Sequence, residues 1–171
     1  MLPNYTVLDA NLEFLPEDAI RSLQSERLGL QVRQCYRSSS FWRRKFDDIY
    51  LTPEDIGGLS DLHKIPFCTK AELLEDQEKY PPFGSYLSVH PSRLTKYFTT
   101  SGTTGRPLTR VYSDRDWTYI RQRFQRKPFL KHGDTAVLLG PTDGLLGPTA
   151  AADSWEAMGA LVIRAARYGT E

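Results

Sequence analysis

Few of the features that place a protein in a specialised class occur in this sequence. It has only two cysteines, Cys35 and Cys68, without a Cys-x-x-Cys pair, so neither a disulfide framework nor a zinc ribbon is predicted. No apolar run approaches the roughly 20 residues that a membrane span needs. The first residues contain acids and a proline instead of the apolar core of a signal peptide. These absences predict free thiols and a cytoplasmic location.

An excess of one charge is also lacking, because the 171 residues carry a net charge of +1. That balance gives no global attraction to nucleic acid or to a membrane surface. The basic run Arg115–Lys131 is a local exception. We interpret it as the solvated face of a helix, and the alternatives are a surface for a phosphate-bearing ligand or for nucleic acid.

Histidine is scarce, and its three positions do not form a metal or catalytic pattern. His63, His90 and His132 lie far apart, with no carboxylate or cysteine at ligand spacing. No Ser-His-Asp or Cys-His nucleophile set can be assembled from the spacing either. We therefore predict neither a metal centre nor a nucleophilic catalytic group.

The composition is that of one ordinary soluble domain, with 40% hydrophobic and 25% charged residues. Residues 1–84 contain helical segments separated by proline and glycine, which predicts a helical N-terminal region. One helix is expected to start near Leu15–Asp18 and to run to about Arg37, and a second is expected from Phe41, capped by one of the serines before it. Helix starts are also predicted at Thr52-Pro53 and at Thr69, where Glu72 completes a capping box.

Residues 85–171 show a different pattern and predict a partial α/β subdomain. Tyr86–Val89 is strand-like, and Lys96–Tyr112 is typical of a hairpin. Ser113–Asp116 opens a helix whose Trp117, Ile120 and Phe124 form one core-facing stripe. A buried parallel strand at residues 135–139, a helix at 149–158 and a strand at 161–163 then form one βαβ unit. The fold class is therefore α/β.

The turn of the predicted hairpin, Thr99–Gly105, is too polar and too rich in glycine to be packing material. Its glycines allow the backbone to approach a ligand closely, and its hydroxyl and N–H groups can point at anionic oxygens. The pattern differs from the Walker P-loop, which requires a Gly-Lys-Ser/Thr ending and a following helix. The residues therefore predict a phosphate-binding loop of another kind.

This loop resembles the phosphate-binding loop of the adenylate-forming ligases, the superfamily of acyl- and aryl-CoA synthetases, and within it the phenylacetate–CoA ligase family. The segments that carry the resemblance are Thr100–Pro107, Phe41–Phe46, Leu59–Leu62, Ile65–Lys70, Pro82–Gly84 and Ala157–Ile163. The chain resembles the N-terminal portion of that family. The implied fold is a helical region, a phosphate-loop hairpin and a βαβ unit, which together form an incomplete portion of the adenylate-forming N-terminal domain.

The resemblance implies an ATP-dependent ligase that converts a carboxylic acid to an acyl-adenylate and then to a coenzyme A thioester, with ATP, Mg and CoA as cofactors. The implied phosphate-binding residues are Thr100, Ser101, Gly102, Thr103, Thr104 and Gly105. Many superfamily members have a lysine where this chain has Leu108, and Arg106 or Arg110 could take its place. Gly140–Pro148 falls where the family has a glycine-rich stretch near the acyl pocket.

The resemblance also implies that several elements are missing, among them the ribose-binding aspartate and the catalytic lysine of the C-terminal domain. We therefore expect the isolated chain to be inactive as a ligase. A C-terminal remainder, giving a split ligase, and a homodimer partner are the implied protein partners, beside ATP and a carboxylic acid. The alternative is a non-catalytic interaction or assembly domain, because the sheet edge after Ile163 is exposed in this arrangement. A third hypothesis is an anion- or nucleic-acid-binding module.

Overall fold

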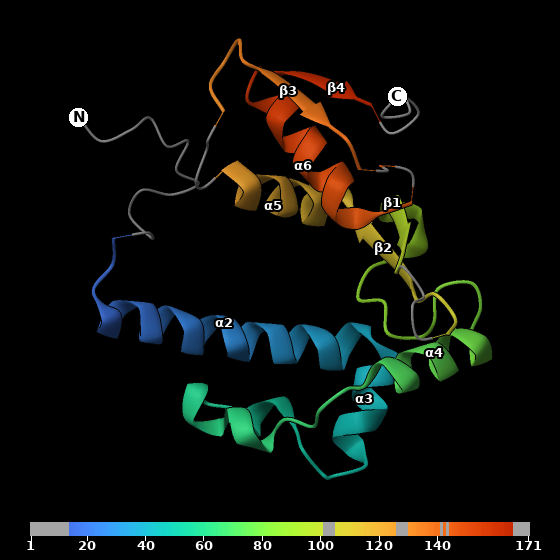
Figure 1. Cartoon of the computed structure of the whole chain (residues 1–171). Helices are drawn as coiled ribbons and strands as arrows, with labels where there is room; N and C mark the ends of the chain where they lie inside the picture. Colours follow the sequence, from blue (N-terminus) through green and yellow to red (C-terminus); the bar gives the residue numbers. More distant parts are fainter. Residues whose placement is uncertain (1–13, 101–104, 126–129, 141, 143, 166–171) are drawn as a thin grey trace. The chain divides into compact units, whose positions relative to one another are not determined.

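The computed structural model describes residues 14–100, 105–125, 130–140, 142 and 144–165 (Figure 1). These residues form two compact units, one that ends at Arg93 and one that begins at Leu94. Within these ranges, none of the helices is both long enough and apolar enough to cross a bilayer.

The first unit begins with the predicted long helix, α2 (Glu17–Ser38), in which Glu17 and Asp18 occupy the first turn and complement its positive end. The next helix, α3 (Ser40–Asp47), is capped by Ser39, whose hydroxyl accepts the N–H of Trp42 at 3.3 Å. Both predicted helices, and the predicted serine cap, are confirmed.

Short helical turns and one further helix complete this unit. They are η1 (Pro53–Asp55), η2 (Leu59–Lys64), α4 (Lys70–Lys79) and η3 (Pro91–Arg93). Capping boxes begin η1 at Thr52 and α4 at Thr69, as the sequence predicts. The buried side chains at the centre of the unit are Val32, Phe46, Leu51 and Ile56. The core thus lies between α2, α3 and the irregular segment that follows them.

The predicted strand at Tyr86–Val89 is wrong, because this segment is irregular. Its neighbours are helices rather than a strand. The carbonyl oxygen of Ser85 accepts the N–H of Phe41 at 3.2 Å, and the amide of Gln34 donates to the carbonyl oxygen of Ser88 at 3.2 Å. The ring of Tyr86 packs edge-on against Phe41, with 6.3 Å between centroids. These contacts with α2 and α3 take the place of the hydrogen bonds to a neighbouring strand that the sequence pattern of this segment predicts.

The second unit contains the predicted hairpin, formed by β1 (Leu94–Thr99) and β2 (Thr109–Ser113). The strands are antiparallel, and their register ends with Thr99 opposite Thr109. The helix α5 (Asp114–Gln125) follows directly and begins in the predicted capping box of Ser113 and Asp116. The hairpin pairing and the helix are confirmed.

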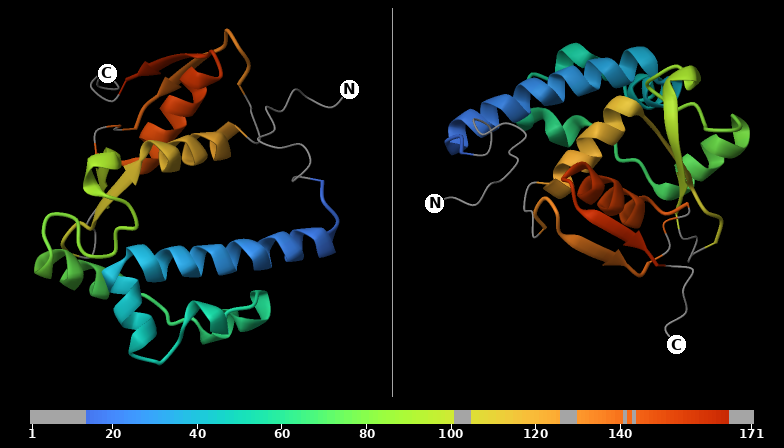
Figure 2. Two further views of the ribbon diagram at one scale, coloured as in Figure 1. Left: turned by 180° about the vertical axis from the view of Figure 1, so that it is seen from behind. Right: turned by 90° about the horizontal axis from the view of Figure 1, so that it is seen from above.

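The remaining elements are β3 (Thr135–Leu138), α6 (Leu146–Ala157) and β4 (Leu161–Arg164). β3 and β4 are parallel neighbours, with Val137 opposite Ile163, as the predicted βαβ unit requires. Figures 1 and 2 show α6 lying along the β3–β4 pair, which it contacts. α6 begins three residues earlier than predicted, because Pro148 lies inside its first turn, where proline is tolerated.

The core of this second unit is aromatic, and two predictions about burial are corrected in it. Phe98, Trp117 and Ala150 are buried and pack against Tyr112, Ile120 and Leu146. Phe124, predicted on the core-facing stripe, is 42% exposed because it lines an open cavity near the end of α5.

The second correction concerns the β3–β4 pair, which was predicted to be buried on both faces. Val137, Leu139, Leu161 and Ile163 are between 42% and 71% exposed. Ala136, whose side chain points to the opposite face from that of Val137, is buried. One face of the pair is therefore covered and the other is open within the described part of the chain.

Candidate functional site

The described ends of the glycine-rich loop are held together by hydrogen bonds just beyond the hairpin. The N–H of Thr100 donates to the carbonyl oxygen of Leu108 at 3.0 Å, and the N–H of Leu108 donates to Thr100 Oγ1 at 2.9 Å. Of the predicted phosphate-binding residues, Ser101, Gly102, Thr103 and Thr104 lie outside the described residues. Thr100 and Gly105 flank them, so the structure fixes where the loop leaves and rejoins the strands.

Gly105 has a backbone conformation that favours glycine, with φ of +129°. A Cβ atom built at this position would meet nothing within 4 Å. Together these observations describe an exposed backbone segment that a ligand can approach closely. That fits the steric requirement of a phosphate-binding loop, and the role of the residue in binding stays a prediction.

The second glycine-rich segment, at Gly140–Pro148, docks against the end of β1. The N–H of Thr99 donates to the carbonyl oxygen of Gly144 at 3.0 Å, and Gly144 has φ of +75°. The hydroxyl of Thr149 is 2.5 Å from the carbonyl oxygen of Thr142, which ties this segment to the first turn of α6. Two loops that are separate in the sequence therefore meet at one end of the hairpin.

Aromatic packing supports the hairpin from α5. Phe98 of β1 stacks on Trp117 with 5.2 Å between ring centroids, and Tyr112 of β2 lies 6.4 Å from Trp117. Offset and edge-on arrangements at these separations stabilise aromatic pairs beyond the area that they bury. Aromatic contacts with α5 therefore support both strands that flank the loop.

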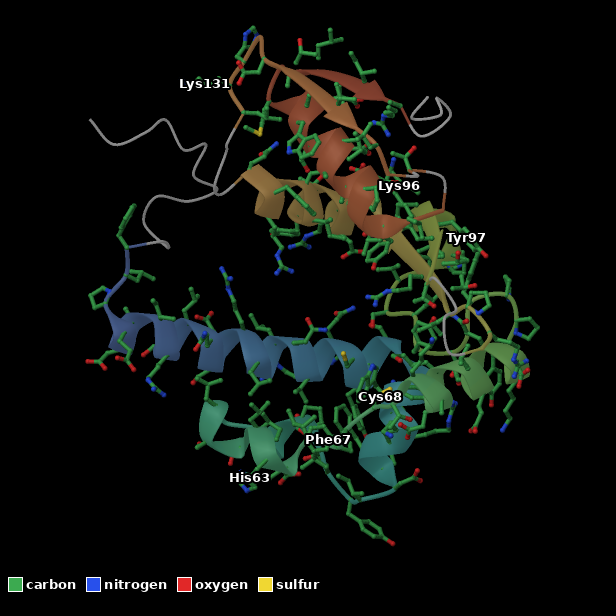
Figure 3. The ribbon with its side chains drawn as sticks, viewed as in Figure 1. His63, Phe67, Cys68, Lys96, Tyr97 and Lys131 are labelled. Atoms are coloured by element: carbon green, nitrogen blue, oxygen red, sulfur yellow. The ribbon has the colours of Figure 1, made fainter. Side chains whose placement is uncertain are left out.

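Asp153 joins four elements of this unit and was not singled out from the sequence. Its carboxylate accepts the indole N–H of Trp117 at 3.0 Å, and it pairs with Lys96 at 3.4 Å and Arg164 at 3.0 Å. Figure 3 shows Lys96 on β1. Partial burial raises the pKa of Asp153, but the hydrogen bonds from Arg164, Trp117 and Lys96 outweigh it and lower the pKa. No local sequence signal identifies this residue, because its partners come from three other elements.

The position of the family's lysine is occupied by Leu108, which is only 6% exposed and turns into the core. Leu108 therefore supplies no cation to the loop. Arg110 is exposed on β2, and its guanidinium lies 5.8 Å from the ring centroid of Tyr112. This places one of the two arginines considered from the sequence close to the loop end of the hairpin.

Across the described ranges, no group of three or more histidine, cysteine or carboxylate side chains is placed to hold a metal ion. His63 and His90 each have a local hydrogen-bond partner, Ser60 and Ser92 respectively. Both cysteines are free, and burial raises the pKa of the Cys68 thiol, which disfavours a reactive thiolate. His63 and Cys68 can be located in Figure 3.

Comparison with known proteins identifies relatives in one family of enzymes. No protein-family model matches the chain. A phenylacetate-coenzyme A ligase of Aromatoleum evansii is 32% identical over 126 residues, which cover 72% of this chain and 28% of that protein. A phenylacetate-coenzyme A ligase of Thermus thermophilus is 36% identical over 105 residues, covering 61% of this chain and 22% of the relative. The matches thus span about a quarter of the length of these relatives.

Solved structures agree with the sequence relatives. The structure of 2-hydroxyisobutyryl-CoA ligase in the postadenylation state has a TM-score of 0.81 at 24% identity, covering 88% of this chain and 32% of that one. The same ligase in its thioesterification state gives a TM-score of 0.81 at 26% identity, with the same coverage. The mixed α/β fold of the chain therefore matches the adenylate-forming ligase fold. The chain belongs to the adenylate-forming ligase superfamily, with sequence relatives among the phenylacetate–CoA ligases.

Proposed function

We propose that the chain provides the ATP phosphate-binding loop of an ATP-dependent carboxylic acid–CoA ligase. The observation that supports the proposal is that Thr100 and Gly105, which flank the loop, follow the β1–β2 hairpin at the end where Thr99 donates a hydrogen bond to Gly144 of the second loop. The names of the relatives, phenylacetate-coenzyme A ligase and 2-hydroxyisobutyryl-CoA ligase, support the same chemistry.

In this proposal the loop residues hold the β- and γ-phosphates through hydroxyl and backbone N–H groups. The residues are Thr100, Ser101, Gly102, Thr103, Thr104 and Gly105. The open space at Gly105 fits such an approach. Bound ATP supplies the leaving group that allows a carboxylate to become an acyl-adenylate, and the thiol of CoA then displaces AMP. Fixed donors at the loop stabilise the charge of the departing pyrophosphate without reorganising.

The remaining assignments follow from the same proposal. Residues 1–84 form the helical N-terminal region, and residues 85–171 form part of the nucleotide-binding subdomain. Mg²⁺ accompanies the nucleotide, and no metal ligand is assigned among the described residues because none of them form a suitable cluster. The ligands are ATP and a carboxylic acid, the site of action is the cytoplasm, and full activity requires protein segments beyond those that match here.

Pyrophosphate exchange tests the proposal. The chain is incubated with ATP–Mg and a panel of aryl and branched-chain acids, alone and together with a separately produced C-terminal portion of a phenylacetate–CoA ligase. We expect exchange only in the mixture, and a higher melting temperature of the chain with ATP–Mg. A melting temperature that ATP–Mg leaves unchanged, combined with no exchange in any mixture, would contradict the proposal.

A second candidate function, an assembly domain, is favoured by the open apolar face of β3 and β4. Val137 and Leu161 are 55% and 62% exposed on it. In that case the chain associates through this face without nucleotide, and Val137→Lys abolishes the association. Sedimentation of the wild type and of Val137→Lys over a range of concentrations tests this association. ATP binding by the variant separates this candidate from the first, because the ligase proposal requires that Val137→Lys bind ATP as the wild type does.

A further inference from the structure

One exposed face of α5 combines arginine side chains with an exposed tyrosine ring. Residues four apart lie on the same face of a helix, so Arg115, Tyr119 and Arg123 form one stripe, which we call the α5 stripe. Tyr119 is 55% exposed, and both arginines are exposed as well. Trp117 is only 3% exposed and lies on the face that packs into the core. An ordered helix thus presents an aromatic ring between two cations.

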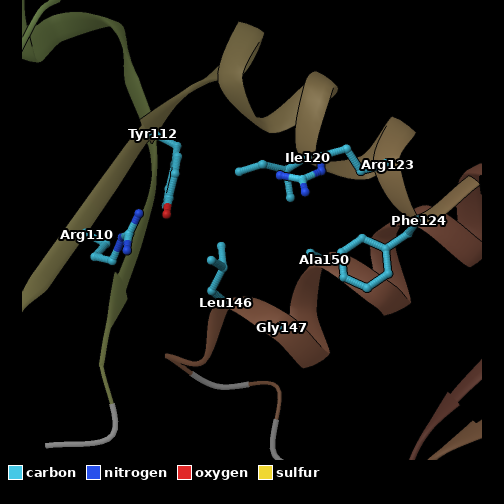
Figure 4. Close-up of a pocket in the computed structure, with 8 residues that line it drawn as sticks. All are labelled: Arg110, Tyr112, Ile120, Arg123, Phe124, Leu146, Gly147 and Ala150. Carbon is cyan, nitrogen blue, oxygen red and sulfur yellow. The ribbon is translucent and has the colours of Figure 1, made fainter. Parts of the chain in front are cut away.

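The α5 stripe continues across the open cavity near the end of α5 to β2. Figure 4 shows Arg110 of β2 and Arg123 of α5 on opposite sides of this cavity, which has a volume of about 600 Å³. Phe124 also lines the cavity and is 42% exposed. The stripe is therefore connected, through Arg123, with a third arginine and a second exposed ring.

Ion pairs do not neutralise the charge of this surface. Arg110, Arg115 and Arg123 form no ion pair with any other described residue. The two acids of α5 lie in its first turn, where they complement the positive end of the helix. The carboxylate of one of them, Asp116, accepts the N–H and the hydroxyl of Ser113 at 3.0 and 2.7 Å. The arginines can therefore pair with an anionic partner.

The spacing of the α5 stripe fits a chain of phosphates. Arg115 and Arg123 are eight residues apart, which corresponds to about 12 Å along a helix axis. Phosphates of one stacked strand rise by about 3.4 Å each, so roughly three or four nucleotides span this distance. Tyr119 lies midway, where a base between those phosphates can stack on its ring. An acidic polypeptide would use the charges, but its carboxylates cannot stack on a ring.

We propose that the α5 stripe, together with Arg110 and Phe124, binds single-stranded nucleic acid with little dependence on base sequence. The three arginines contact phosphates, and bases stack on Tyr119 and Phe124. Every base has a flat face, so this stacking does not select one sequence over another. Binding of this kind needs neither ATP nor a carboxylic acid, and the inference does not rest on the proposed ligase reaction.

Fluorescence anisotropy of a labelled strand of about twelve thymidines measures this binding to the whole chain, with ATP omitted. We expect a Kd of about 100 μM or tighter near physiological salt, as for other sequence-independent binding. With three phosphates neutralised, the logarithm of the association constant should fall with the logarithm of salt concentration with a slope of about −2. A strand of the same length without bases carries the same phosphates and should bind at least about fivefold more weakly.

Variants separate the contribution of stacking from that of charge. Tyr119→Ala is expected to weaken binding at least about fivefold and to leave the salt slope unchanged, because it removes a ring and no charge. Tyr119→Phe keeps the ring and should bind as the wild type does. Arg115→Gln is expected to weaken binding at least about threefold and to reduce the salt slope by about 0.7.

Two matched controls remove the same groups elsewhere. Tyr97 is 57% exposed on β1, and its side chain points to the opposite face from that of Phe98, which packs into the core. Arg21 is 65% exposed in the first unit. Tyr97→Ala and Arg21→Gln should therefore leave the Kd within about twofold of the wild-type value. Because all the substituted side chains are exposed, we expect the melting temperatures of these variants to stay close to that of the wild type.

Four outcomes would overturn the inference. They are no saturable binding of the thymidine strand, equal affinity for the strand without bases, full binding by Tyr119→Ala, and an equal loss of binding in Arg115→Gln and Arg21→Gln. Polyglutamate of the same charge that competes with an affinity equal to that of the strand would also overturn the proposed class of partner, because the rings would then contribute nothing.

Discussion

The N–H of Thr99 donates a hydrogen bond of 3.0 Å to the carbonyl oxygen of Gly144, and this bond joins the two glycine-rich loops of the chain. Thr99 is the last residue of β1, directly before the proposed phosphate-binding residues. Gly144 lies two residues before α6. The end of β1, from which the first loop departs, is therefore held against the second loop.

Gly144→Ala is expected to destabilise the protein by about 1–2 kcal/mol. The φ of +75° at this position is unfavourable for a residue with a Cβ atom, whereas the space around it is open to 4.0 Å. Urea unfolding measures the change. Gly147→Ala is the control, since this helical glycine has no positive φ and alanine favours the helix by up to about 1 kcal/mol. Equal stability of Gly144→Ala and the wild type would contradict the argument.

Gly105→Ala is expected to weaken ATP–Mg binding at least about tenfold, which corresponds to about 1.4 kcal/mol. Its added methyl group and the altered φ place an obstacle where the phosphates approach the loop. Gly133→Ala is a matched control, because Gly133 is also exposed, has φ of +85° and has nothing within 4 Å of a built Cβ. Calorimetry of the two variants therefore separates loss of the site from backbone strain, and equal affinities would argue against a phosphate-binding role.

Local signals predicted most of the helices correctly. The capping boxes at Thr69 and Ser113 act within a few residues, so their helices can be read from the sequence alone. The hairpin and the parallel pair were also predicted, because their residues have clear strand patterns. The prediction of a strand at Tyr86 is wrong because a contact between distant residues determines the structure there. Tyr86 packs against Phe41, which is distant in sequence, and no local pattern specifies that contact.

Asp153→Asn is expected to cost about 1–2 kcal/mol of stability at neutral pH, because it removes the charge that Lys96 and Arg164 face in a partly buried setting. The pKa of Asp153 is lowered in the folded state, so its contribution is present above the usual carboxylate pKa and is lost as the pH falls below that range. Urea unfolding at several pH values measures both effects.

Glu156→Gln is the control for this variant. Glu156 also pairs with Arg164, at 2.8 Å, but its side chain is 46% exposed. Exposed pairs contribute little, so we expect a change below about 0.5 kcal/mol. If Glu156→Gln lowers the free energy of unfolding more than Asp153→Asn does, the argument that partial burial strengthens the ion pairs of Asp153 is wrong.

Glu72→Gln is expected to remove a contribution to the free energy of unfolding that changes with pH in the acid range. The hydrogen bond from Lys45, and then that from the N–H of Thr69, lower the pKa of Glu72 from 4.5 to about 2. The unfolded chain therefore binds more protons between these two values, so the contribution of Glu72 is complete above pH 4.5 and is lost as the pH falls to about 2. The difference in stability between wild type and variant should be largest at neutral pH and vanish near pH 2.

Glu75→Gln is the matched control on the same helix, because Glu75 is exposed and forms no ion pair with any described residue. Its unfolding curve should follow that of the wild type through the acid range. A difference between Glu72→Gln and the wild type that persists unchanged at pH 2 would refute the assignment of the pKa shift to the pairing with Lys45.

The candidate site itself was less predictable than the helices. The loop composition predicted a phosphate-binding segment, and the resemblance predicted the family, which the comparisons confirm. The roles of Ser101 and its neighbours stay predictions. Arg110 and Arg123 were considered separately, as a substitute cation and as part of a solvated helix face. Their position around one cavity depends on how α5 packs against β2, and tertiary packing of this kind has no signature in the sequence.

The contacts of Asp153 have a consequence for how the second unit opens. Through this single side chain α6 is bonded to β1, α5 and β4, so none of the four can move away without breaking a charged hydrogen bond. Elements tied in this way open together as one cooperative unit, and their amide hydrogens exchange with solvent at similar free energies. In Asp153→Asn that unit should divide, so that the amides of β4 exchange earlier than those of α5.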